Sequence, residues 1–333
     1  MGRGGDGAGG VLPEASDSES VGRGWAWGWR LVFYVVLLLL LVLVLQGAVA
    51  LMYPASIGEL TVWGAGAACG AALLATWVMM SAVESRPPAS IGLALSSRAA
   101  RDSAAGFILG FALVSSVLVT MVAGGWLHRL GRAPGGSADL GATLYVTVLL
   151  MLAALFEEVA VRGYVFQVLA RARGPTVAIG STALVFAGLH GANPGVGWTA
   201  IGNTLLAGIL LGILYWRTLS LWWVTGAHFA WNWTMGVAVG LPVSGLDVGA
   251  PVVGMTATGP SLLTGGDYGP EAGLLLTLAT LVGIVWTART PRLSRDPAVL
   301  ALGPIIETTV ERAVETGPRQ QRDSGIRLGS EEA

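Results

Sequence analysis

The chain has 333 residues, of which 53 % are hydrophobic and 12 % charged, with a formal net charge of −1. This composition excludes an ordinary soluble domain, and nothing in it favours nucleic-acid binding. Long continuous apolar runs exclude a membrane β-barrel, whose strands are short and alternating. A lone cysteine, Cys69, excludes a disulfide framework and a cysteine-based metal site. We therefore expect an all-α fold, a polytopic transmembrane helical bundle.

Eight apolar segments predict about eight membrane spans, because crossing a bilayer takes about 20 apolar residues. The segments are Leu31–Leu51, Leu60–Val83, Ala104–Trp126, Gly141–Ala170, Pro175–His190, Trp198–Trp216, Leu219–Gly240 and Glu271–Ala288. The fifth is the shortest, so its ends are the hardest to predict. Four-residue spacings of glycine, such as Gly66/Gly70 and Gly106/Gly110, indicate faces where helices pack closely.

The spans divide the chain into five regions. We expect a disordered cytosolic tail (1–28), two N-terminal spans with a connector (29–103), a core of further spans (104–240), an outer loop with the last span (241–289), and a polar cytosolic tail (290–333). The last tail is expected to be disordered apart from a short helix near 305–314.

Arginines fix the expected orientation, since short cytosolic segments of membrane proteins are enriched in positive charge. With the N-terminus inside, the outer segments hold only Arg129 and Arg132, and all other arginines are inside. This distribution places both termini in the cytosol. The abundance of Arg, Gly and Ala is typical of a high-GC bacterial genome, so we expect a multi-pass protein of a bacterial plasma membrane.

Two adjacent carboxylates stand out in the fourth segment. Between Ala104 and Leu246 the only acids are Asp139, Glu157 and Glu158. Ionisable residues inside a membrane are costly and usually functional. Glu158 and Arg162 are four residues apart and share a helix face, which favours a structural ion pair. Glu157 points about 100° away, leaving its carboxylate free to act as a base.

The rare imidazole and amide side chains cluster downstream of the carboxylates. Phe186 and His190 share one helix face, and His228 and Asn232 share another, each pair being four residues apart. Polar groups this rare should face the bundle interior, forming a polar intramembrane cavity. Three further polar residues are expected to be loop or packing groups without a role: His128, Asn193 and Asn203.

This set of side chains suits hydrolysis. A partly desolvated Glu157 can act as a general base on water. Histidine can orient the water or protonate the leaving amine, and the His228/Asn232 pair can donate to an oxyanion. Two histidines and a glutamate also form the ligand set of some catalytic zinc sites, so Glu157, His190 and His228 are candidate zinc ligands. The sequence leaves zinc-bound and metal-free activation of the water both open.

The three motifs resemble those of a known family. Glu157-Glu158-x-x-x-Arg162, Phe186-x-x-x-His190 and His228-x-x-x-Asn232 look like the ordered motifs of the CPBP (CAAX protease and bacteriocin-processing, or Abi) intramembrane proteases, which include Rce1-type prenyl-protein endoproteases. The resemblance implies that Glu157 and His190 activate water, that His228 and Asn232 stabilise the oxyanion, and that Glu158 and Arg162 support them. It implies a peptide substrate in or near the membrane, without specifying prenylation.

Two other functional classes compete with an intramembrane endopeptidase. A non-catalytic bacteriocin-immunity or scaffolding protein would keep the fold without turnover. A transporter or proton-relay protein would carry polar residues along the full depth of several helices, or inverted repeats with broken spans. The sequence shows one compact polar cluster instead, which favours the endopeptidase.

Overall fold

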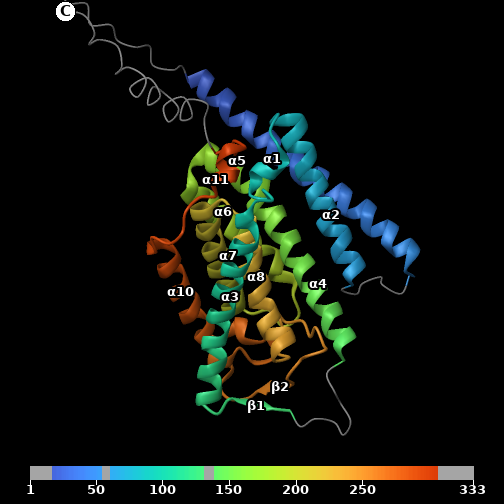
Figure 1. Cartoon of the computed structure of the whole chain (residues 1–333), viewed down its shortest axis with the longest axis vertical. Coiled ribbons are helices and arrows are strands. Elements are labelled where there is room, and N and C mark those ends of the chain that lie inside the picture. The colour runs from blue at the N-terminus through green and yellow to red at the C-terminus, as the bar shows by residue number, and fades with distance from the viewer. Residues whose placement is uncertain (1–16, 55–60, 131–138, 307–333) are drawn as a thin grey trace, which may run out of the picture.

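The computed structural model describes residues 17–54, 61–130 and 139–306, and nearly all of its regular structure is helical (Figure 1). The longer helices are α1 (Asp17–Met52), α2 (Val62–Val78), α3 (Ser97–Ala123), α4 (Leu140–Glu158), α5 (Tyr164–Arg173), α6 (Pro175–Leu189), α7 (Trp198–Thr218), α8 (Leu221–Trp233) and α10 (Leu274–Arg289). Helices α9 (Ser261–Thr264) and α11 (Pro297–Ala301) are short.

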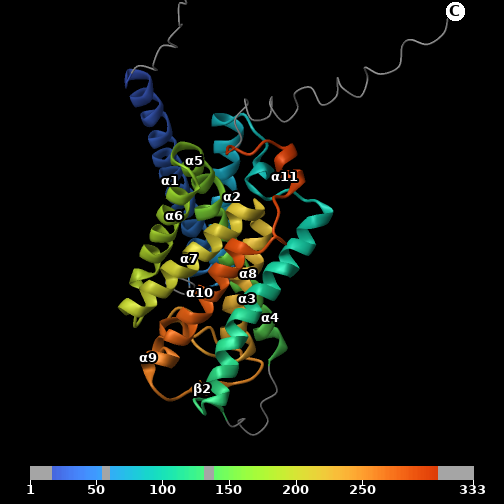
Figure 2. The same ribbon diagram turned by 90° about the vertical axis from the view of Figure 1, so that its left-hand side faces the viewer.

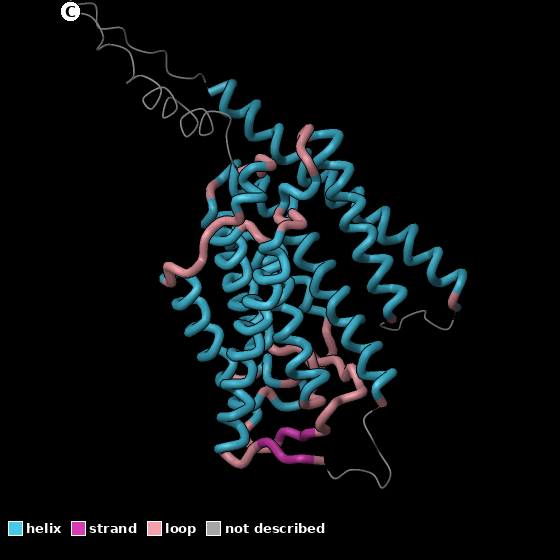
Figure 3. The backbone as a smooth tube through the Cα atoms, viewed as in Figure 1, coloured by secondary structure: helices cyan, strands magenta, loops and turns pink. Residues whose placement is uncertain are grey.

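One end of the bundle carries the only strands in the described part of the chain (Figure 3). Strand β1 (Leu127–Arg129) follows α3 and pairs antiparallel with β2 (Met255–Ala257), with His128 opposite Thr256. Helices α5 and α11 lie at the opposite end (Figures 1 and 2). Helices α3, α4, α7 and α8 run between these two ends.

Six described helical segments are long and apolar enough to cross a membrane. They are Trp27–Met52, Val62–Val83, Ser97–Ala123, Leu140–Arg173, Pro175–Ala192 and Trp198–Thr218. Of the remaining two expected spans, Leu219–Gly240 forms α8 with a following π-helical turn, and Glu271–Ala288 forms mainly α10, which is apolar but shorter. The chain therefore has the helices of a multi-pass membrane protein, while the count of eight stays a prediction.

The two ends of the described chain are more ordered than we expected. Residues 17–28 are helical and continue into the first span as part of α1. Beyond α10, residues 290–306 fold back over the bundle, and Ile305 is completely buried. The Ile305 N–H donates to the Gln167 side chain at 2.8 Å, and the Ile305 carbonyl accepts from Arg171 at 3.1 Å. Most of the short helix expected near 305–314 lies outside the described residues.

A line of glycines brings α3 and α8 into backbone contact. A Cβ added at Gly110 would lie 2.1 Å from the Ala227 carbonyl oxygen, and one at Gly106 would lie 2.1 Å from that of Trp223. Gly226 on α8 faces Ser103 in the same way. Small residues allow such close approach between membrane helices. The contact fixes the height and rotation of α8, the helix that carries His228 and Asn232.

This close contact predicts that Gly110→Ala is strongly destabilising. The added methyl group meets backbone atoms that cannot rotate away, and overpacking of this kind typically costs about 1–3 kcal/mol or more. Thermal unfolding in detergent should show a clear fall in the midpoint. Gly70→Ala is the matched control, because a Cβ at Gly70 on α2 meets nothing within 4 Å. Equal midpoints for the two variants would contradict the close packing of α3 on α8.

Candidate active site

The two carboxylates lie at the end of α4, just before a change in helix type. Glu157 and Glu158 are the last residues of α4, and a π-helical turn, Val159–Gly163, follows directly. Single π-helical turns within α-helices are frequent at functional sites. A second π-helical turn, Thr234–Ala238, directly follows the helix that carries His228 and Asn232. Both polar motifs therefore sit where the regular helical ladder is interrupted.

Glu158 and Arg162 form the ion pair that their spacing predicts. Arg162 Nη1 lies 3.1 Å from Glu158 Oε1, and both side chains are completely buried. The Arg162 guanidinium also lies over the Phe186 ring, 4.3 Å from its centroid, in a cation–π contact. A buried pair of this kind is costly to desolvate and strongly destabilising to break, since one partner alone leaves an uncompensated charge.

Glu158 has a second partner that the sequence did not predict. His228 Nδ1 lies 2.8 Å from Glu158 Oε1, the same oxygen that meets Arg162. His190 is held in a similar way, with Nδ1 at 2.8 Å from the Phe186 carbonyl oxygen. Because a backbone carbonyl only accepts, His190 carries a proton on Nδ1, and an ionised Glu158 accepts from His228 likewise. In the neutral imidazoles this leaves the lone pairs on both Nε2 atoms.

Glu157 lies between these two nitrogen atoms. Its Oε2 is 3.9 Å from His190 Nε2 and 3.9 Å from His228 Nε2. The Glu157 side chain is 29 % exposed, whereas that of His228 is 8 % exposed. A water with hydrogen bonds of about 2.8 Å to the carboxylate and to one Nε2 spans such a separation. The geometry thus allows one water to contact both a base and an imidazole.

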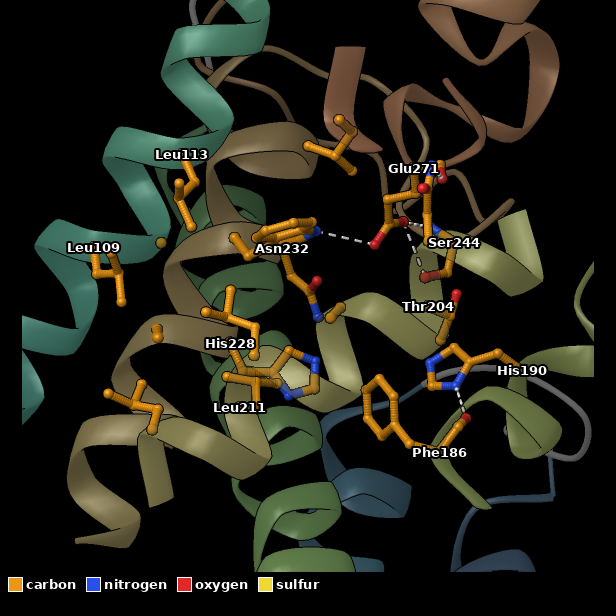
Figure 4. Close-up of a pocket in the computed structure, with 18 residues that line it drawn as sticks. Leu109, Leu113, Phe186, His190, Thr204, Leu211, His228, Asn232, Ser244 and Glu271 are labelled. Carbon is orange, nitrogen blue, oxygen red and sulfur yellow. Dashed lines mark hydrogen bonds between the residues drawn. The ribbon is translucent and has the colours of Figure 1, made fainter. Parts of the chain in front are cut away.

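Asn232 follows His228 by one helical turn and lines a pocket with both histidines (Figure 4). Its side-chain amide makes no hydrogen bond to another described protein group, unlike the amides of Asn193 and Asn203. Asn193 donates to the Ser244 carbonyl, and Asn203 donates to the carbonyls of Glu271 and Gly273. These two asparagines hold loops, while Asn232 is available to a ligand.

The three candidate zinc ligands do not fit a zinc ion as they are placed. Among the described residues, no group of three or more His, Cys, Asp or Glu side chains is arranged to hold a metal. Tetrahedral zinc with ligands at about 2.1 Å brings the ligand atoms to about 3.4 Å of one another. The carboxylate of Glu157 is farther than this from both Nε2 atoms, so the three side chains would have to move closer together.

Sequence reasoning missed one acid of the pocket, Glu271. Its carboxylate accepts from the Trp231 indole N–H at 3.1 Å and from the backbone and hydroxyl of Ser244. The expectation placed Glu271 only at the start of the last span, and no spacing linked it to His228 and His190, which lie 43 and 81 residues upstream. His128, expected to have no role, is exposed on β1 at the strand-bearing end of the bundle.

Comparison with known families identifies the segment that carries this site. Residues 139–234 match the sequence model described as Rce1-like, type II CAAX prenyl endopeptidase. The matched segment begins at the residue before α4 and ends just after α8, and it contains all three motifs. No match to the chain was found among curated proteins or solved structures.

The matched segment therefore belongs to a class of membrane proteases. More particularly, residues 139–234 form a domain of the Rce1-like type II CAAX prenyl endopeptidase (CPBP) family, which confirms the resemblance of the motifs. Helices α1–α3, the loop after α8 and helix α10 lie outside the match.

The buried pair makes a stability prediction. Arg162→Met should destabilise the protein by about 3–5 kcal/mol, because Glu158 would remain buried without its cation. The double variant Glu158→Gln/Arg162→Met should recover part of this loss, since no charge remains. Unfolding in detergent with chemical denaturant measures both. A double variant no more stable than Arg162→Met would contradict the assignment of the loss to an unpaired carboxylate.

Proposed function

We propose that this protein is an intramembrane endopeptidase that hydrolyses a peptide bond of a membrane-associated protein or peptide. The observation that carries the proposal is the position of Glu157 Oε2, at 3.9 Å from the Nε2 atoms of both His190 and His228. Membership of the matched segment in a protease family supports the same reaction class. The reaction needs only water and the peptide as reactants.

In the proposed mechanism, Glu157 takes a proton from a water held between its carboxylate and His190 Nε2. The water oxygen then attacks the peptide carbonyl carbon, and a tetrahedral oxyanion forms. Glu157 is suited to this step because its Oε2 has no hydrogen-bond partner among the described groups, so its lone pairs are available. The Nδ1 hydrogen bond to Phe186 fixes the ring of His190 for its part in the same step.

Asn232 and His228 are proposed to stabilise the oxyanion. The Asn232 amide donates directly, and His228 joins it when its ring is already protonated before the reaction, so that Nε2 also carries a proton, which it keeps throughout. The proton taken by Glu157 passes to the leaving amine nitrogen, by way of His190, when the carbon–nitrogen bond breaks. Glu158 acts through His228, because its hydrogen bond to Nδ1 sets the orientation of the ring and supports a proton on it.

We further propose that the protein lies in a bacterial plasma membrane with eight spans and both termini in the cytosol. The helix-rich fold and the six long apolar segments support a multi-pass arrangement. The distribution of arginines supports the orientation. In this arrangement α5, α11 and residues 290–306 face the cytosol, and the strands β1 and β2 face outward.

The proposed base makes the first functional prediction. Glu157→Gln should lower the cleavage of membrane peptides by about 10²–10⁴-fold, because a neutral amide cannot accept the proton of the water. Asn232→Ala should lower it by about 10²–10³-fold through loss of an oxyanion donor. Cleavage is measured on purified protein in detergent, by mass spectrometry of a peptide library.

The control for both variants is His128→Ala, which removes an imidazole on β1 and should leave cleavage unchanged. Wild-type protein that is folded but cleaves no peptide, or a Glu157→Gln variant as active as wild type, would leave the non-catalytic scaffolding alternative as the better assignment.

A second prediction concerns zinc. Since the three candidate ligands are too far apart for tetrahedral coordination, we expect cleavage to survive prolonged treatment with a chelator. Metal analysis of the purified protein should show no stoichiometric zinc. Zinc at one ion per chain, lost in His190→Ala together with activity, would overturn metal-free activation and assign Glu157, His190 and His228 as ligands.

A further inference from the structure

The pocket behind the two histidines differs from the site at which Glu157 lies. Its volume is ≈ 40 Å³, and His190, His228 and Asn232 line it while Glu157 does not. Helices α3, α6, α7 and α8 supply most of its wall. Glu271 and Ser244 lie across it from the histidines (Figure 4). The two histidines therefore line the pocket and also lie near the Glu157 carboxylate.

The pocket presents polar groups whose hydrogen-bonding capacity the protein does not use. The Asn232 amide and both Nε2 atoms have no hydrogen-bond partner among the described residues, although each Nε2 lies near Glu157. The Glu271 carboxylate accepts hydrogen bonds from neutral groups of Trp231 and Ser244. It forms no ion pair with a cationic side chain among the described residues. Buried polar groups are normally satisfied, by protein or by ordered water. These groups together favour a small hydrogen-bonding ligand.

The size of the pocket suits water. A cavity holds one water when it offers about 10–15 Å³, so this one has room for a few. The remaining wall is apolar, with Leu113 of α3 and Leu276 of α10 among its residues. An apolar wall keeps such waters in place by offering them no other partners.

The pocket also lies where a supply of water is needed. Glu157 is the most exposed member of the trio, so a peptide bound for cleavage would approach it and cover that side. Hydrolysis consumes one water per turnover, and lipid supplies none. Water held in the pocket lies beside His190 and His228, whose Nε2 atoms are 3.9 Å from the Glu157 carboxylate, so its path to the base is short.

We propose that this pocket is a hydration chamber, in which Glu271 and Ser244 hold ordered waters that replenish the hydrolytic water at Glu157. The role in replenishment rests on the proposed endopeptidase function, whereas the binding of water does not. Glu271 and Leu276 belong to the segment outside the family match, so the chamber is completed by residues that the family domain of this chain lacks.

Hydroxyl-radical labelling tests the chamber directly, because brief radiolysis oxidises side chains in contact with bound water. Trp231 lines the pocket, while Trp223 lies two turns earlier on α8 in the apolar core, and each is 8 % exposed. In the full-length protein in detergent, Trp231 should be oxidised roughly tenfold faster than Trp223 if water is held beside it. Equal rates would overturn the proposal.

A variant that fills the pocket with a larger side chain provides a second test. Ala207 on α7 lines the pocket, and Ala207→Val should bring the oxidation of Trp231 down to the rate of Trp223. The same variant should lower kcat roughly tenfold with KM unchanged, since substrate binding is not altered. The matched control is Ala112→Val, at an exposed position of α3, which should change neither quantity.

The two tests separate the two proposals. Unchanged labelling of Trp231 in a folded Ala207→Val protein would overturn the chamber, whether or not the enzyme is active. Absence of cleavage by wild-type protein would overturn the proposed function, and labelling would still decide whether the pocket binds water. Reduced labelling with unchanged kcat would overturn the role of the chamber in replenishment.

Discussion

The arrangement of the site depends on one buried oxygen atom, Glu158 Oε1. It lies 3.1 Å from Arg162 Nη1 and 2.8 Å from His228 Nδ1, so it joins the end of α4 to the middle of α8. When one carboxylate oxygen accepts hydrogen bonds from two donors in an apolar interior, neither donor side chain can move far without losing its bond. Phe186 extends the connection to α6, since its ring covers Arg162 and its carbonyl holds His190. The three helices that carry the motifs are thus fixed by a single buried network.

The glycine contact between α3 and α8 complements this network. Hydrogen bonds set the rotation of the histidine rings. Backbone contact at Gly106 and Gly110 sets the position of α8 along its axis. Neither alone would define the site, because a hydrogen bond of 2.8 Å tolerates little displacement of the helix that carries it. Helix α3, which makes this backbone contact, lies outside the segment matched to the family.

Much of the site could be predicted from sequence because its motifs are local. A four-residue spacing places Glu158 beside Arg162, and rotation by one residue frees Glu157. The spacing could not reveal that Glu158 also holds His228, since that bond joins residues 70 apart. Glu271 was missed for the same reason. The order of residues 290–306 was missed because the tail 290–333 as a whole is polar, whereas the burial of Ile305 depends on partners far upstream, Gln167 and Arg171.

The return of the chain's last described residues to the bundle has a consequence for biogenesis. Gln167 and Arg171 on α5 remain without these bonds until Ile305 has been synthesised, 138 and 134 residues later. Helix α10 and Glu271 reach the pocket late as well. Domains of many proteins fold while the ribosome still extends them. Here the helices that carry the motifs are synthesised before residues 271–305, and their final packing awaits this segment. Assembly of the candidate site is therefore coupled to synthesis of the chain as far as Ile305.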